Sequence, residues 1–195
     1  MDILVFVIYF IVPIGWWLIT ARKKESFFSW IGLKKPTPRK SLWILAIVNV
    51  VLNYVSLKYI TPLFLPQGLT VQSQYAGMGW SALPSILYFG LIDTGFSEEF
   101  FFRGFLLKRL QNRFGFVVGN TLHAAVFGLM HFVPLITLSI SLWFPATMFF
   151  LVAGLTGWMY GYISEKSSGG SIIPVILIHG VGNVTVSLLY AFNLM

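Results

Sequence analysis

The sequence has few charged residues and no cysteine. Asp, Glu, Lys and Arg make up 10% of its 195 residues, whereas a soluble domain carries roughly 25%. Apolar residues make up 57%, and the mean hydropathy is +0.82. Too few polar side chains remain to cover a water-soluble globule, so the composition indicates an integral membrane protein. Without cysteine there are no disulfides and no thiolate chemistry, and any metal site must use His, carboxylates or amides.

The charges that are present are mostly positive. Thirteen Lys and Arg against six Asp and Glu give a net charge of +7. In a protein with several membrane spans, such residues set the orientation and do not form a phosphate-binding patch. No nucleic-acid partner is therefore expected.

Six segments are long and apolar enough to be interpreted as spans, because about 20 apolar residues cross a hydrocarbon core of about 30 Å. The segments are at about 3–20, 41–64, 83–107, 115–133, 145–163 and 171–193. The first has no basic region before it and no cleavage site, which favours a span over a signal peptide. We expect an all-α, polytopic transmembrane helical bundle that forms a single domain over residues 1–195.

The basic residues also predict how the bundle is oriented. Eleven of the thirteen lie between spans one and two, after span three, or between spans five and six. The loops on the other side, at about 65–82 and 134–144, contain no charged residue. The positive-inside rule places the basic loops in the cytoplasm and both termini outside. The compact, cysteine-free, multi-pass form is typical of a bacterial plasma-membrane protein.

The third predicted span contains Asp93, Glu98, Glu99 and Arg103. Ionisable residues inside a span are costly and by default mark a functional site. A helix starting here with Ser97 as its N-cap would explain part of this charge, and Glu99 with Arg103 would form a structural i, i+4 ion pair. Glu98 is left unexplained, because it lies about 100° around the helix and needs its own partner or a proton.

Spans four and six carry groups that could serve Glu98. His123 and His131 lie on span four, and His179 and Asn183 lie one turn apart on one face of span six, with two glycines between them that let another helix approach. At about 1.5 Å per residue, Glu98, His179 and Asn183 lie about 15, 12 and 18 Å deep. His131 lies about 22 Å deep and His123 about 10 Å, so depth alone does not choose between the two histidines.

Three short motifs on three successive predicted spans carry a family resemblance. They are EExxxR at Glu98–Arg103, FxxxH at Phe127–His131 and HxxxN at His179–Asn183. In order and separation the chain resembles the CPBP family of intramembrane endopeptidases, which groups CAAX proteases with bacteriocin-processing and abortive-infection proteins. The motif-bearing core is about 83–193.

The resemblance implies hydrolysis of peptide bonds inside the membrane. It makes Glu98 the carboxylate that activates water, helped by His131, which is thereby preferred to the other histidine of span four. His179 and Asn183 would stabilise the oxyanion. Glu99, paired with Arg103, would hold the motif helix. The expected partner is a peptide precursor or membrane-associated protein, with no oligomeric state predicted.

We expect no cofactor and a glutamate-type mechanism. The alternative is Zn²⁺ held by Glu98, His131 and His179, a set with one open position. Against zinc, the sequence has no HExxH pair, and Asn183 is a poor zinc ligand.

Two other classes of function are consistent with the sequence. One is a non-catalytic immunity or scaffold protein that binds a peptide such as a bacteriocin. The other is a proton or ion pathway in which Asp93, Glu98, His123 and His131 form a relay.

Overall fold

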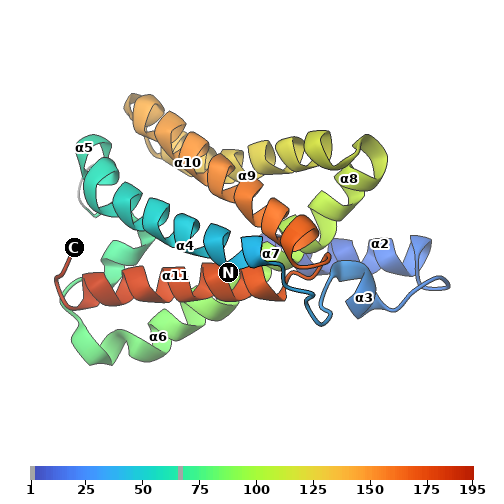
Figure 1. Ribbon diagram of the computed structural model, residues 1–195. Helices are drawn as coiled ribbons and strands as arrows, with labels where there is room; N and C mark the ends of the chain where they lie inside the picture. The colour runs from blue at the N-terminus through green and yellow to red at the C-terminus, as the bar shows by residue number, and fades with distance from the viewer. Residues whose placement is uncertain (1–2, 66–67) are drawn as a thin grey trace.

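The computed structural model describes residues 3–65 and 68–195, and all regular elements in these ranges are helices. Four helices are long and apolar enough to cross a membrane: Lys40–Leu63, Phe116–Leu138, Ile140–Ser167 and Ile173–Ala191. They correspond to predicted spans two, four, five and six. The expected polytopic helical membrane bundle is thus confirmed (Figure 1).

The elements follow one another with short connections. The N-terminal part consists of α1 (Ile3–Phe6), η1 (Val7–Ile11), α2 (Val12–Thr20), α3 (Phe27–Ile31), α4 (Lys40–Val55), η2 (Ser56–Ile60) and α5 (Thr61–Phe64). Two 3₁₀ turns follow, η3 (Val71–Tyr75) and η4 (Gly79–Ala82). The remaining long helices are α9 (Phe116–Leu138), α10 (Trp143–Tyr162) and α11 (Ile173–Ala191), with η7 (Ile140–Leu142) and η8 (Ile163–Ser167) on either side of α10. The first predicted span forms a shorter apolar helix, Leu4–Thr20.

The third predicted span is one uninterrupted helix that changes its hydrogen-bonding pattern along its length. It comprises α6 (Leu83–Leu87), η5 (Tyr88–Phe96), α7 (Ser97–Glu99), η6 (Phe100–Leu107) and α8 (Lys108–Phe114). Both η5 and η6 are π-helical, a form that is rare and frequent at functional sites.

No new helix starts at Ser97, contrary to the expectation that it is an N-cap. Phe96 before it has helical dihedral angles, φ −80° and ψ −52°. The Ser97 hydroxyl donates to the Ile92 carbonyl oxygen at 2.7 Å, so it bonds backward within the helix and does not cap a following turn. The helix instead continues through Ser97 with π-helical turns on both sides, which the sequence pattern did not indicate.

Two glycines allow η5 and α11 to pack in direct backbone contact. A Cβ atom on Gly95 would lie 2.7 Å from the Cα atom of Gly180 and 2.6 Å from the carbonyl oxygen of Gly90. Such distances are too short for any side chain. The expectation that the two glycines between His179 and Asn183 let another helix approach is therefore confirmed for Gly180. It is not for Gly182, because nothing lies within 4 Å of a Cβ atom added there.

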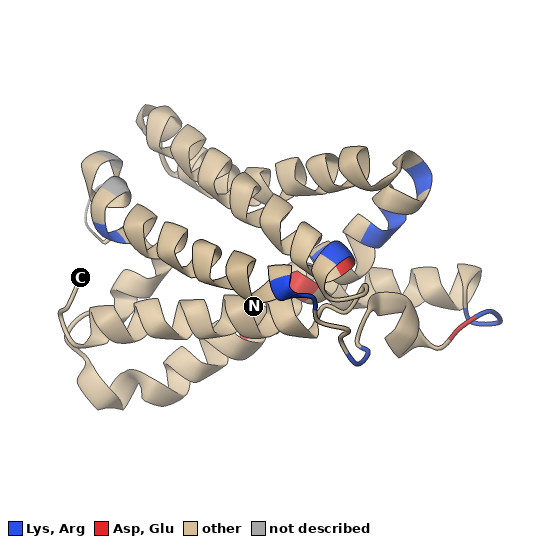
Figure 2. Ribbon diagram, viewed as in Figure 1, with Lys and Arg blue, Asp and Glu red and all other residues tan. Residues whose placement is uncertain are grey.

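The end of the bundle that carries the basic loops is held together by hydrogen bonds between distant segments. Figure 2 shows most Lys and Arg residues on the right-hand side, away from the C-terminus. Arg39, just before α4, donates its backbone N–H to the carbonyl oxygen of Ser167 at 2.9 Å. Lys108 donates to Glu165 at 2.6 Å and to the carbonyl oxygen of Gly170 at 2.9 Å. Burial lowers the pKa of Lys108, and the adjacent Glu165 carboxylate counteracts this.

Replacing Gly95 by Ala should destabilise the bundle, because the new methyl group would overlap backbone atoms of α11. We expect the free energy of unfolding in detergent to fall by about 1–3 kcal/mol. The matched control is Gly15→Ala in α2, where nothing lies within 4 Å of the added atom. Equal melting temperatures for the two variants would contradict the close contact.

Candidate active site

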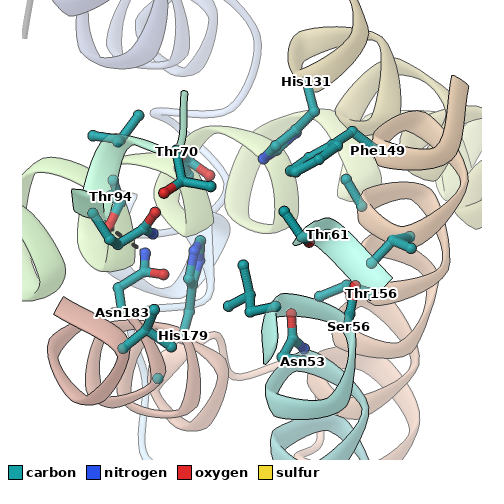
Figure 3. Close-up of a pocket in the computed structure, with 18 of the residues that line it drawn as sticks. Asn53, Ser56, Thr61, Thr70, Thr94, His131, Phe149, Thr156, His179 and Asn183 are labelled. Atoms are coloured by element: carbon teal, nitrogen blue, oxygen red, sulfur yellow. Dashed lines mark hydrogen bonds between the residues drawn. The ribbon is translucent and has the colours of Figure 1, made fainter. Parts of the chain in front are cut away.

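A cavity of about 820 Å³ lies between α4, η5, α9, α10 and α11. Glu98, His131, His179 and Asn183 all line it, so the structure brings together the four side chains selected as catalytic from the sequence. Figure 3 shows His131 entering from α9, and His179 with Asn183 entering from α11. The arrangement places titratable and amide groups from three motifs around one space.

The cavity wall is mostly apolar and carries little charge. Glu98 is the only carboxylate among the lining residues that the structure describes, and they include no Lys or Arg. The other polar groups are hydroxyls, amides and the two histidines. The cavity is therefore a largely apolar space with a single described carboxylate on its wall.

Glu99, next in the chain to Glu98, is fully buried and does not line the cavity. Its Oε1 atom accepts a hydrogen bond from Arg103 Nη1 at 2.8 Å, which is the i, i+4 pair expected from the sequence. The same oxygen lies 2.8 Å from Nδ1 of His179 on α11. The Glu99–Arg103 ion pair therefore stabilises its own helix and also fixes the orientation of His179, which lines the cavity.

Aromatic rings cover the Arg103 guanidinium. The centre of the group lies 4.3 Å from the Phe127 ring and 5.1 Å from the Tyr160 ring. Cation–π contacts of this kind stabilise a buried cation where water is absent. They explain the Phe of the FxxxH motif, whereas no motif pointed to Tyr160.

Asn183 is held by Thr94, a residue that sequence reasoning missed. The Asn183 amide Nδ2 donates to Thr94 Oγ1 at 2.8 Å. The Thr94 hydroxyl hydrogen is directed to the carbonyl oxygens of Phe89 and Gly90, at 3.0 and 3.2 Å. Since that oxygen can only accept from Asn183, the amide orientation is determined, and the second N–H of Asn183 stays available.

The two histidines of α9 have different surroundings. His131 Nδ1 lies 3.0 Å from the carbonyl oxygen of Phe127 and therefore carries a proton, so that Nε2 of the neutral imidazole has the lone pair. His123 is fully buried, does not line the cavity, and lies 3.3 Å from Asn120 Oδ1. Asn120 in turn donates to the Trp158 carbonyl oxygen at 2.9 Å, which links α9 to α10.

Two of the four groups in the relay hypothesis lie outside this cavity. Neither Asp93 nor His123 is among the residues that line the cavity, so the four groups of the supposed relay do not share one space.

The alternative zinc set does not fit the geometry. In the two stretches that the structure describes, 3–65 and 68–195, no three His, Asp or Glu side chains are grouped closely enough to hold a metal ion. Glu98, His131 and His179 share the cavity without forming such a group.

Comparison with known families adds the decisive observation. The family model described as type II CAAX prenyl endopeptidase Rce1-like matches residues 79–185, which include all three motifs. The chain belongs to this family. At the level of the family it is a CAAX-type intramembrane protease, and the matched part of the chain begins after α5. No curated protein and no solved structure gives a significant match.

Replacing Arg103 by Met should strongly destabilise the protein, because the Glu99 carboxylate would stay buried without its cation. Losing one partner of a buried pair costs about 3–5 kcal/mol. Denaturant unfolding of the detergent-solubilised protein measures the change. Arg113→Met, at an exposed position of α8, is the matched control and should unfold like the unchanged protein. Similar stability of the two variants would show that Arg103 is not needed to compensate Glu99.

Proposed function

We propose that this member of the family is an intramembrane endopeptidase of the glutamate type, in which Glu98 activates the attacking water. The observation that carries the proposal is the position of Glu98, which is the one carboxylate among the described residues that line the cavity, together with both motif histidines and Asn183. The neighbouring Glu99 is unsuited to this task, because its charge is already engaged by Arg103 and His179.

The first step of the proposed reaction transfers a proton from water to Glu98 as the water oxygen attacks the substrate carbonyl carbon. His131 assists, since its Nε2 lone pair can accept the other water hydrogen and orient the molecule. The protonated Glu98 then gives its proton to the leaving amine nitrogen as the carbon–nitrogen bond breaks. One group thus serves as base and acid in turn.

The negative charge that develops on the carbonyl oxygen needs donors directed at it. Asn183 has one amide N–H left after its bond to Thr94. His179 in its protonated form offers Nε2–H, because Nδ1–H is already directed to Glu99. Glu99 holds the His179 ring through Nδ1, and Arg103 keeps Glu99 in place, so both act as positioning residues.

The proposed substrate is a peptide precursor or a membrane-associated protein segment that is hydrophobic near the cleaved bond. Its class follows from the cavity wall, which offers apolar contacts and neutral hydrogen-bonding groups. A strongly acidic segment would meet Glu98 and would find no Lys or Arg among the described lining residues.

Replacing Glu98 by Gln should abolish cleavage, because the amide cannot take the proton from water. We expect the turnover number to fall by about 10²–10⁴-fold. The measurement compares purified, detergent-solubilised wild type and variant on a hydrophobic peptide library read by mass spectrometry. Glu25→Gln, which changes an exposed carboxylate before α3, is the matched control and should cleave normally.

Three outcomes would count against the proposal. Equal cleavage by the Glu98→Gln variant would show that another group activates water. No cleavage by folded wild type would favour a non-catalytic binding protein. Activity that a chelator removes and zinc restores would replace the glutamate mechanism by a metal-dependent one.

Replacing Thr94 by Val should misplace Asn183, because the acceptor of its amide N–H is lost while the side-chain size is kept. We expect the turnover number to fall by about tenfold to a hundredfold with little change in KM. Thr94→Ser keeps the hydroxyl and should restore most of the turnover. A change in KM alone, or no change, would show that Thr94 does not position a group for the transition state.

A further inference from the structure

The wall of the cavity opposite the motif residues is formed by α4 and carries two asparagines. Asn49 and Asn53 lie one turn apart and both line the cavity. Figure 3 shows Asn53 pointing into the cavity from α4, across from His179 and Asn183. Both precede the residues matched by the family model, which start at 79. The family match therefore assigns them no role.

The orientation of the two amides follows from their hydrogen bonds. Asn53 Nδ2 donates to the backbone carbonyl oxygen of Asn49 at 2.9 Å, which identifies this atom as the nitrogen. The same nitrogen donates to Asn49 Oδ1 at 3.1 Å, which fixes the Asn49 amide as well. Asn53 Oδ1 is then left as an acceptor on the cavity side, as Figure 3 shows.

The usual structural role of asparagine in a span does not account for this pair. Such residues commonly bond across to a neighbouring helix, but both bonds recorded for these side chains stay within α4. Asn49 is 2% exposed, and its Nδ2 has no partner among the residues the structure describes. A buried unpaired donor lowers stability, so hydrogen bonding to a neighbouring helix does not explain why an asparagine stands at position 49.

We propose that Asn53 Oδ1 is a substrate-binding group that accepts a hydrogen bond from a backbone N–H of the peptide, with Asn49 holding the amide in position. The peptide would then lie between two walls, with its scissile carbonyl facing Glu98 and Asn183 and one of its N–H groups facing α4. A backbone contact of this kind fixes the register of the peptide without reading its side chains. The inference rests on the proposed function, since it names the part of the substrate that the cavity recognises.

The test measures binding separately from cleavage. The probe is a fluorescent alanine–leucine peptide, together with esters of it in which one N–H at a time is replaced by oxygen. Its dissociation constant is measured by fluorescence anisotropy on the full chain in lipid nanodiscs, with protein-free nanodiscs as background. The Glu98→Gln protein serves as host so that the peptide stays intact. Val51→Leu, on an exposed face of α4 outside the cavity, is the matched control.

We expect one ester to bind about three- to tenfold more weakly than the amide peptide, as for loss of one neutral hydrogen bond. Asn53→Leu should weaken binding of the amide peptide by a similar factor. In this variant, the same ester should bind as tightly as the amide peptide. Val51→Leu should change nothing.

The proposal is overturned if the effects of Asn53→Leu and of the ester multiply independently, if neither weakens binding, or if the peptide does not bind. Wild-type cleavage of the same peptide is assayed in parallel. Binding that depends on Asn53 without any cleavage would leave this subsite standing and defeat the proposed function. Cleavage together with binding that does not depend on Asn53 would support the proposed function and overturn the subsite.

Discussion

The buried guanidinium of Arg103 is the group on which the arrangement of the site depends. A cation inside a membrane bundle must be compensated by a carboxylate and shielded by polarisable surfaces, since water is absent. Glu99 compensates the charge, while Phe127 and Tyr160 cover its faces. His179 completes the network through the same carboxylate oxygen. Four helical segments, η6, α9, α10 and α11, are thereby brought to one point, and the cavity lies beside it.

This network separates the tasks of two adjacent carboxylates. Glu98 and Glu99 differ by one position on α7 and so point in directions about 100° apart. The Glu99 carboxylate is buried between Arg103 and His179, whereas Glu98 lines the cavity. The π-helical segments on both sides set the orientation of this short turn. A buried charge that holds the scaffold therefore lies one residue from a carboxylate that is available for proton transfer.

Much of the fold and site could be predicted from the sequence, because a membrane span must be apolar and its few charged residues need partners or a function. Spans two, four, five and six and the Glu99–Arg103 pair follow from such signals. Charge and depth also pointed to Glu98, His179 and Asn183, whereas His131 was preferred to His123 only through the family resemblance. All four selected residues line the cavity. The sequence did not predict the contact of His179 with Glu99 instead of Glu98, or the support of Asn183 by Thr94. Both depend on the rotation of η5 and α7 relative to α11, which π-helical turns alter without a compositional sign. The orientation in the membrane stays a prediction.

The backbone contact of η5 with α11 through Gly95 and Gly180 has a consequence for the architecture of the molecule. Two helices that touch without intervening side chains cannot slide or rotate independently, so the segment bearing Glu98 and the one bearing His179 and Asn183 form one rigid block. α4 is joined to the basic end through Arg39 and Ser167, and its asparagines bond only along its own axis. It also packs against the rest of the bundle through Leu42, which shares a buried cluster with Tyr160, Ile172 and Val175. The two walls of the cavity therefore differ in construction: one is a pair of helices in direct backbone contact, and the other is held through side-chain packing and the basic end.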